Sequence, residues 1–239
     1  GSEDSMSTSL FLRPDRKNRN IFLNVVMVFS AIVMGLWSAS VGAEATLQPA
    51  SNQIAQSDSE IVYFRTADLH IAFAPKAFSF FAFEEYKKLG IRAAAVRMQE
   101  WSGVRVKEAN LSPNMIVLRG RGFDSIIESD DPLVRSVLNQ FFFGAEGYQE
   151  KARRLIGPEQ DCFFLNAVSS HGRILSTVVF LNSRLSKSDE AICFVRSLAG
   201  AFGAVDLVLL NKEITISTDT GRITLGDDLK QAFSGIYVF

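Results

Sequence analysis

Residues 162–181 read Cys-Phe-Phe-Leu-Asn-Ala-Val-Ser-Ser-His-Gly-Arg-Ile-Leu-Ser-Thr-Val-Val-Phe-Leu, and this stretch carries the clearest fold signal in the chain. Two apolar runs, Cys162 to Val168 and Ile174 to Leu181, are rich in β-branched and aromatic residues and have the length of strands. Between them, Ser169 to Gly172 are typical of a tight turn. The stretch therefore predicts a β-hairpin.

Helices and further strands surround the hairpin. Ser186 and Asp189 form a capping-box pattern that opens a helix reaching about Phe202, and Gly203 suits its C-terminal cap. Asp131 followed by proline predicts another helix start. Further strands are predicted at residues 61–64, 69–74, 104–106, 115–118, 214–217 and 222–225, and further helices after residue 90, at 149–156 and at 227–233. Because strands and helices come in blocks rather than in strict alternation, we expect a single α+β domain of hairpins and packed helices.

The N-terminal part has the features of an export signal. Basic residues between Arg13 and Arg19 precede an uncharged apolar run at residues 21–37, which is a little short for a membrane span of about 20 residues. Val41 and Ala43 then fit a signal-peptidase site. We expect residues 6–43 to be a signal peptide cleaved after Ala43, with an uncleaved membrane anchor as the alternative. Residues 1–5 have the composition of a cloning remnant.

The segment after the leader is polar and built from small residues, so residues 44–59 are predicted to be a flexible linker. The folded domain is then expected at residues 60–239. An exported chain of this kind would be periplasmic or secreted in a Gram-negative bacterium, or held at the inner membrane if the leader stays attached. The leader would be its only contact with the membrane.

Cys162 and Cys193 are the only two cysteines. An even number of cysteines in an exported chain predicts a disulfide bond. The alternative is a pair of buried thiols, since both residues have apolar neighbours in the sequence. A redox function is not indicated, because the chain has no Cys-x-x-Cys motif.

The sequence lacks the residues that are typical of several classes of function. The net charge is −1 with acids and bases interspersed, so no basic stripe indicates nucleic acid as a partner. The two histidines, His70 and His171, lie far apart in the sequence, and the motifs His-Glu-x-x-His and Gly-x-Ser-x-Gly are absent. No phosphate or dinucleotide loop is recognisable. We therefore predict no catalytic residue, no metal ligand and no cofactor.

Phenylalanine is unusually common, with 20 Phe against four Tyr and two Trp. Clusters at residues 78–83 and 141–143 hold more apolar rings than such short segments usually need. These rings could line a pocket for an acyl chain or face a partner protein, or they could simply form a Phe-rich core. The candidate binding residues are Phe78, Phe80, Phe81, Phe83, Phe141, Phe142 and Phe143.

Four motifs carry a resemblance to a known family. They are Trp101 followed by Val104-Arg-Val, Cys162-Phe-Phe followed by Val178-Val-Phe, Cys193-Phe-Val-Arg-Ser-Leu-Ala-Gly-Ala-Phe-Gly, and Thr224-Leu-Gly-Asp with Tyr237. In these motifs, residues 92–239 resemble a family of exported proteobacterial proteins of unknown function that are similar to zinc peptidases. The resemblance implies a zincin-like version of the α+β fold.

The chain departs from that family at the positions that would matter for catalysis. Arg196 and Ser197 stand where the family has two glutamates, Gly200 replaces glutamine, and Gly226 replaces histidine. A glutamate there would be the general base for a metal-bound water, and an arginine would repel a divalent cation. The resemblance therefore implies a degenerate, metallopeptidase-like domain.

Three functions follow as hypotheses. The first is a non-catalytic domain of the cell envelope that binds a protein partner. The second is a carrier or sensor of a hydrophobic ligand that uses the Phe-rich clusters. The third is a hydrolase whose site the sequence does not reveal.

Overall fold

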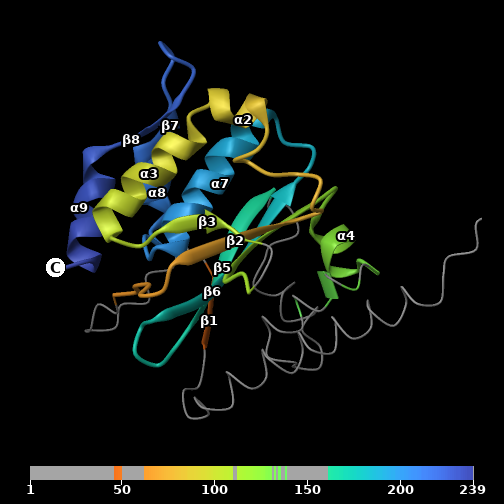
Figure 1. Ribbon diagram of the computed structural model, residues 1–239, viewed down its shortest axis with the longest axis horizontal. Coiled ribbons are helices and arrows are strands. Elements are labelled where there is room, and N and C mark those ends of the chain that lie inside the picture. Colours follow the sequence, from red (N-terminus) through yellow and green to blue (C-terminus); the bar gives the residue numbers. More distant parts are fainter. Residues whose placement is uncertain are drawn as a thin grey trace, which may run out of the picture. The chain divides into compact units, whose positions relative to one another are not determined.

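The computed structural model describes residues 46–49, 62–109, 112–130 and 161–238, together with Pro132, Val134, Arg135 and Leu138. Within these residues a mixed six-stranded sheet runs through the domain, as Figure 1 shows. In spatial order its strands are β1 (Thr46–Pro49), β5 (Cys162–Val168), β6 (Ile174–Asn182), β4 (Met115–Gly120), β2 (Leu69–Ala74) and β3 (Val106–Glu108). Together with the helices, this sheet makes the domain the α+β fold that the sequence predicts.

The predicted hairpin is confirmed. β5 and β6 pair antiparallel, with Cys162 opposite Leu181 and Leu165 opposite Val178. β4 pairs parallel with β6, and β2 pairs parallel with both β4 and β3. The carboxyl ends of β2, β4 and β6 therefore meet at one edge of the sheet.

Two predicted strands differ from the structure. The strand expected at residues 104–106 lies at 106–108 instead, because its pairing with β2 sets Val106 opposite Leu69. The prediction of a strand at residues 61–64 is wrong for residues 62–64, which are the part of this range that the structure describes. Phe64 forms only an isolated parallel bridge with Arg173, so this segment has the pattern of a strand without a strand's partners.

The sheet also begins earlier than the sequence indicates. β1 lies inside the segment predicted to be a flexible linker, residues 44–59, and pairs antiparallel with β5. Main-chain pairing at a sheet edge needs no apolar side chains, so the polar composition of this segment concealed it. The predicted leader at residues 6–43 lies outside the described residues.

Most of the described helices lie on one face of the sheet, as Figure 1 shows. They are α2 (Glu84–Lys88), α3 (Ile91–Ser102), α7 (Lys187–Ala201), α8 (Leu207–Glu213) and α9 (Asp227–Ile236). The short helix α4 (Phe123–Ile127) packs on the other face. Successive residues of β5 serve the two faces in turn: Phe164 belongs to the core beneath α7, and Phe163 and Leu165 belong to the core beneath α4.

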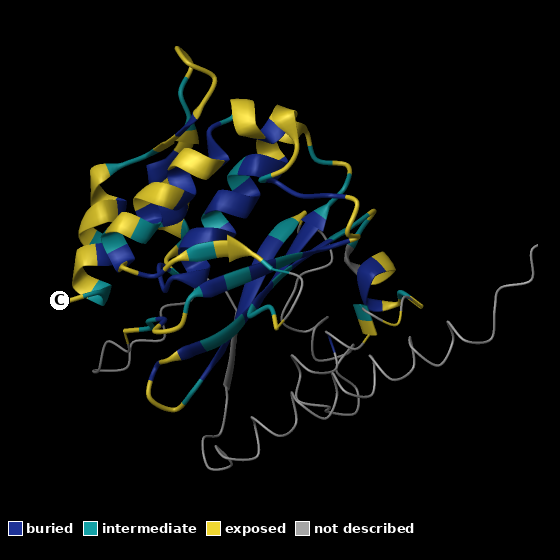
Figure 2. Ribbon diagram, viewed as in Figure 1, coloured by how far each residue is buried: buried dark blue, intermediate teal, exposed yellow. Residues whose placement is uncertain are grey.

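The strands predicted at residues 214–217 and 222–225 are present as β7 (Ile214–Ile216) and β8 (Ile223–Leu225), which pair antiparallel in a two-stranded sheet of their own. Its tip, residues 217–222, projects from the domain and is mostly exposed, as Figure 2 shows. The helix expected at residues 227–233 is α9 and extends to Ile236. α8 was not predicted; it begins after Asp206, whose carboxylate accepts hydrogen bonds from the N–H groups of Val208 and Leu209.

The helix predicted from Asp131 is present where the structure describes it. Pro132, Val134, Arg135 and Leu138 have helical backbone, and Leu138 is buried in the core beneath α4. The helix predicted at residues 149–156 lies outside the described residues. No helix within the described residues combines the length and apolar character needed to cross a membrane.

The central helix α7 has strong signals at both of its ends. The Ser186 hydroxyl accepts a hydrogen bond from the Asp189 N–H at 3.1 Å, as the capping-box pattern predicts. At the other end the N–H of Ala204 bonds to the carbonyl of Ala199, and the N–H of Gly203 bonds to that of Gly200. These two bonds define a Schellman motif, in which Gly203 adopts the positive φ of 114°.

Candidate functional site

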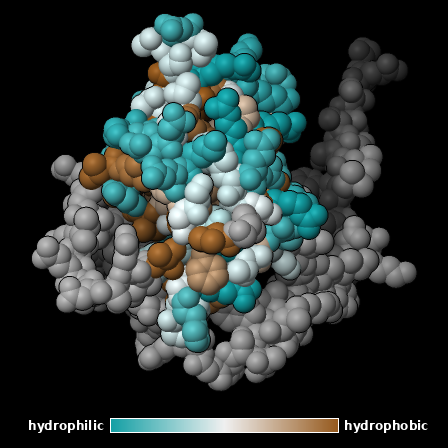
Figure 3. All heavy atoms as spheres, turned by 90° about the vertical axis from the view of Figure 1, so that its left-hand side faces the viewer, coloured by the Kyte–Doolittle hydropathy of each residue, from teal (hydrophilic) through white to brown (hydrophobic). Residues whose placement is uncertain are grey.

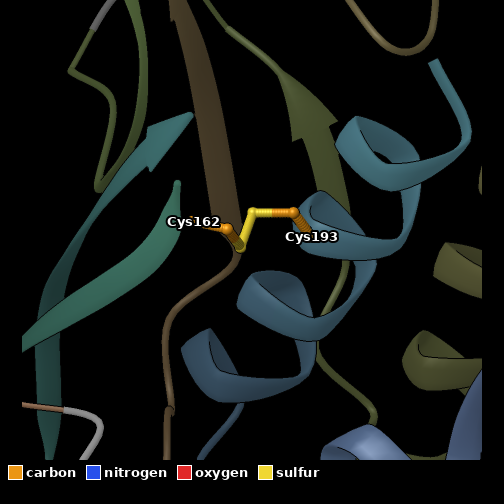
Figure 4. Close-up of a disulfide and its surroundings, with 2 residues drawn as sticks. All are labelled: Cys162 and Cys193. Atoms are coloured by element: carbon orange, nitrogen blue, oxygen red, sulfur yellow. A yellow bond between two sulfur atoms is a disulfide. The ribbon is translucent and has the colours of Figure 1, made fainter. Parts of the chain in front are cut away.

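The two cysteines form the predicted disulfide, which Figure 4 shows. Cys162 begins β5 and Cys193 lies in the middle of α7, with their Cα atoms 5.9 Å apart. The bond therefore fastens the central helix to the sheet. No other cysteine is present, so it leaves no thiol for chemistry.

Most of the described candidate phenylalanines are core residues. Phe78 and Phe80 are buried and pack with Phe73, and the ring of Phe80 stacks on that of Phe194 at a centroid distance of 4.3 Å. Phe81 is partly buried against the same rings, so Phe83 is the only exposed member of its cluster, at 44 %. The rings fill the space that they enclose, as a Phe-rich core does. Phe141, Phe142 and Phe143 lie outside the described residues.

Arg196 and Ser197 lie on α7 and have different surroundings. The Arg196 guanidinium donates hydrogen bonds to the carbonyls of Asn211 and Ile214, at 3.3 and 3.1 Å, where α8 ends. Burial lowers the pKa of Arg196 from its ordinary value. Ser197 is completely buried, and its hydroxyl has no hydrogen-bond partner in the described part of the chain.

At Gly200 and Gly226, neighbouring side chains occupy the space that a Cβ atom would need. A Cβ at residue 200 would overlap the ring of Phe164, which is itself buried in the core. A Cβ at residue 226 would overlap the carboxylate of Glu213. That carboxylate accepts a hydrogen bond from the N–H of Asp228 at 3.2 Å and so caps the N-terminus of α9. A side chain at residue 200 would require the buried ring of Phe164 to move, and one at residue 226 would require the Glu213 carboxylate to leave its place at the start of α9.

Among the described residues, no three His, Cys, Asp or Glu side chains come close enough to hold a metal ion. His70 lies on β2, whereas His171 is exposed in the turn between β5 and β6, beside Ser170. The four positions above thus form no cluster of donor groups. Two other regions, which were not predicted from the sequence, contain buried charged side chains with several hydrogen bonds.

The first region, which we call the carboxyl-edge cluster, comprises Tyr86, Arg119, Lys187 and Glu190. Glu190 is 0 % exposed, and its carboxylate accepts hydrogen bonds from the Tyr86 hydroxyl and from Nε of Arg119, the latter at 2.7 Å. Nζ of Lys187 donates to the Tyr86 hydroxyl at 3.0 Å and lies 3.5 Å from Glu190. The cluster joins α2, β4 and α7 where the carboxyl ends of β4 and β6 meet.

The charged groups of this cluster pair with one another, which indicates a structural role. Burial, together with the bond to Glu190, raises the pKa of Tyr86, and the bond to Tyr86 raises the pKa of Lys187. Arg119 also lies over the ring of Phe78, 5.6 Å from its centroid. Each charged group already has a partner, and the buried carboxylate is fully satisfied. A glutamate in the first turn of a helix is expected from the helix dipole alone, so Glu190 did not indicate these contacts.

The second region contains a buried guanidinium. Arg65 is 1 % exposed, and none of the described acidic side chains pairs with it. Its Nε donates to the carbonyl of Ala201 and its Nη2 to the hydroxyl of Thr177, both at 2.8 Å, while Nη1 has no acceptor among the described residues. Burial lowers the pKa of Arg65 to about 10, so the side chain is still charged at neutral pH. Its charge faces the negative end of the α7 dipole.

A groove adjoins Arg65 at the surface, and we call it the C-terminal groove. Its volume is about 350 Å³, and it is lined by residues 102–104 after α3, by residues 236–238 at the end of α9, and by Phe64, Arg65, Thr66 and Asp68. Val238 is 85 % exposed, and Val62, two residues before the segment, is 47 % exposed. Figure 3 looks onto the side that carries the end of α9, where apolar residues come together between hydrophilic surfaces.

Comparisons with family models, with curated proteins and with solved structures returned no match to this chain. The class of protein is therefore defined by what the structure itself shows: an α+β domain whose sheet and central helix are joined by a disulfide.

Proposed function

We propose that this chain is an exported, non-catalytic domain of the cell envelope that binds a protein partner. The observation that carries the proposal is the C-terminal groove, whose lining combines polar residues with Ile236, Tyr237 and the exposed Val238 at the end of α9. Exposed valines beside a groove are typical of a surface that is covered by something else.

Packing at the degenerate positions supports the non-catalytic part of the proposal. At Gly200 and Gly226 the ring of Phe164 and the carboxylate of Glu213 take the place of a side chain, and Arg196 is committed to the end of α8. These residues serve stability rather than chemistry. The disulfide supports an oxidising compartment, and with the predicted leader it favours the periplasm or the exterior.

The test is to isolate the exported, tagged chain from its own envelope after crosslinking and to weigh the complexes by native mass spectrometry. A protein bound at a fixed stoichiometry is the expected result. Recovery of a stoichiometric lipid would instead support the carrier hypothesis, which the self-packed phenylalanines of residues 78–81 do not favour. Zinc-dependent hydrolysis of a peptide substrate by the purified chain would contradict the proposal.

A further inference from the structure

The carboxyl-edge cluster lies at the edge where the parallel strands β2, β4 and β6 end. The chain leaves β2 and β6 for helices on the α7 face of the sheet, whereas it leaves β4, which lies between them, for α4 on the other face. Neighbouring strands whose connections leave toward opposite faces mark the position at which open parallel sheets bind ligands. The topology therefore directs attention to the side chains at the end of β4.

Arg119, at the end of β4, has one side of its guanidinium fixed and the other free. Its Nε donates to the buried carboxylate of Glu190 at 2.7 Å, and the group lies over the ring of Phe78, 5.6 Å from the centroid. Its two Nη atoms have no partner among the described residues, and the side chain is 26 % exposed. A guanidinium held in this way presents its free Nη atoms in a fixed orientation, which suits an oxyanion bound through two hydrogen bonds.

Lys187 brings a second cation to the same carboxylate. Its Nζ lies 3.5 Å from Oε2 of Glu190, whereas Nε of Arg119 contacts Oε1, and the Lys187 side chain is 50 % exposed. The charge of Arg119 opposes the rise in the pKa of Lys187, so the two cations are close enough to repel each other. Two positive charges share one negative charge here, and a bound anion would offset the surplus.

Two further arginines extend the positive charge along this edge. The N–H of Ser183 bonds to the carbonyl of Gly120 at 2.6 Å, so Arg121 and Arg184 follow two residues that are paired with each other. Both arginines are exposed, and neither guanidinium has a partner in the described part of the chain. The ends of β4 and β6 and the first turn of α7 thus contain four basic and two acidic side chains, a balance that attracts anions.

We propose that this edge binds a phosphate group, with the Nη atoms of Arg119 and Nζ of Lys187 as hydrogen-bond donors and with Arg121 and Arg184 as surrounding positive charge. A phosphate suits several cations better than a carboxylate does, because it carries about 1.5 to 2 negative charges and three acceptor oxygens. Glu190 is a positioning residue that orients the guanidinium. The site is independent of the partner-binding function, because none of these residues lines the C-terminal groove.

The test is isothermal titration calorimetry of the disulfide-bonded protein with inorganic phosphate, near neutral pH and with sodium chloride holding the ionic strength constant. We expect a Kd of about 1 mM or below. Arg119→Lys keeps the charge but loses the two-pronged donor, and Lys187→Met keeps the apolar stem but loses the charge, so each should raise the Kd at least about fivefold. The absence of binding to wild type up to about 20 mM phosphate would overturn the proposal.

Matched variants at exposed residues elsewhere are the controls. Arg97→Lys on α3 and Lys230→Met on α9 make the same two changes outside the carboxyl edge, so the Kd should stay at the wild-type value. If Arg119→Lys does not fold, the half-exposed Lys187 still decides the question. A Kd that is unchanged in Lys187→Met, or that rises as much in the controls, would place the phosphate elsewhere and overturn the proposal.

Further probes distinguish the sources of the phosphate group. Glycerol 3-phosphate presents it on a small soluble molecule, and phosphatidylcholine vesicles with and without phosphatidic acid present it on a membrane. Sedimentation of wild type, but not of Lys187→Met, with the phosphatidic acid vesicles would assign the site to a lipid headgroup. Binding of glycerol 3-phosphate without sedimentation would assign it to a soluble ester, and binding of inorganic phosphate alone would assign it to the free ion.

Discussion

Gly203 is the residue at which the backbone of α7 turns away from the helix. Its φ of 114° is unfavourable for a residue with a side chain, and a Cβ there would overlap the carbonyl oxygen of Tyr63. Gly203→Ala should therefore lower the free energy of unfolding by about 2 kcal/mol or more, measured by urea denaturation. Gly221→Ala is the control, because its φ is also positive, at 63°, but its surroundings are open.

The two glycine variants separate strain from steric overlap. Gly221→Ala should cost only about 1 kcal/mol, the ordinary penalty of a left-handed conformation. If the two variants lose the same stability, the contact with Tyr63 relaxes without cost and the close approach has no energetic consequence.

Ser197 is the opposite case, because removal of its hydroxyl should not lower the free energy of unfolding. Its hydroxyl is buried, and its Oγ has no hydrogen-bond partner among the described residues. Ser197→Ala should therefore be neutral or raise the free energy of unfolding by up to about 1 kcal/mol, because the unmade bond no longer opposes folding. The measurement is again the urea midpoint at constant m-value.

Thr177→Val is the matched control for that change. The Thr177 hydroxyl is equally buried, but it accepts a bond from Arg65 and donates one to Asn166, both at 2.8 Å. Its removal should cost about 1 to 3 kcal/mol. A loss of that size in Ser197→Ala would show that the hydroxyl has a partner after all, such as an ordered water.

At the scale of elements, the C-terminus of α7 is completed by residues from distant parts of the chain. Asn166 donates to the carbonyl of Gly200, Arg65 to that of Ala201, and Tyr237 to that of Phe202. The last carbonyls of a helix have no partners within it, and burial of this helix end requires that each one be satisfied. Arg65 is therefore both a cap and a cation at the negative end of the dipole.

Tyr237 makes this cap sensitive to alkaline pH. Burial raises its pKa to about 12, above the ordinary value of 10. The folded state thus holds the phenolic proton more tightly than the unfolded state. The stability from this group is complete below about pH 10 and is lost as the pH rises from about 10 towards 12.

We therefore expect the advantage of wild type over Tyr237→Phe in free energy of unfolding to shrink between about pH 9 and about pH 11.5. Arg65 acts in the opposite direction in this range, because its lowered pKa makes the folded state release its proton first. Arg65 is present in both proteins, but Tyr237 raises the pKa of Arg65, so the difference between them reports on Tyr237 together with this coupling. A constant difference would mean that the hydroxyl ionises as easily in the folded protein as in the unfolded one.

The elements differ in how far the sequence determines them. The hairpin β5–β6, the capped start of α7 and its end at Gly203 were predictable because each depends on residues close together in the chain. The exact position of β3 and the existence of β1 were not, since both depend on pairing with strands that lie far away in sequence. Hydrophobic periodicity indicates which face of a helix or strand is buried, but it does not indicate which strands pair with each other.

The candidate site divides in the same way. The disulfide was predictable from the number of cysteines and the leader, whereas Arg65, Glu190 and the C-terminal groove were not. A buried arginine or glutamate has the same appearance in a sequence as an exposed one. Only the fold brings Thr177 and Ala201 to Arg65, or the segment 64–68 to the end of α9.

At the scale of the whole molecule, the sheet separates two cores, and most of the large buried side chains lie on the α7 side. From Glu190 onward α7 is buried against the sheet and the other helices, apart from the half-buried Ile192 and Arg196. The disulfide joins the middle of α7 to the start of β5, across a sequence separation of 31, and the loop that it closes contains both strands of the central hairpin.

Replacing both cysteines, as Cys162→Ala with Cys193→Ala, should lower the free energy of unfolding by about 3 to 4 kcal/mol, because the unfolded chain regains the freedom of that loop. Reduction of wild type with dithiothreitol should produce a similar loss, while the same treatment should leave the double variant unchanged. Since the loop holds the strands that organise the sheet, the loss should appear in one cooperative transition rather than as local fraying. A double variant as stable as oxidised wild type would show that packing alone fixes α7 on the sheet, and the disulfide would then mark only the compartment in which the protein folds.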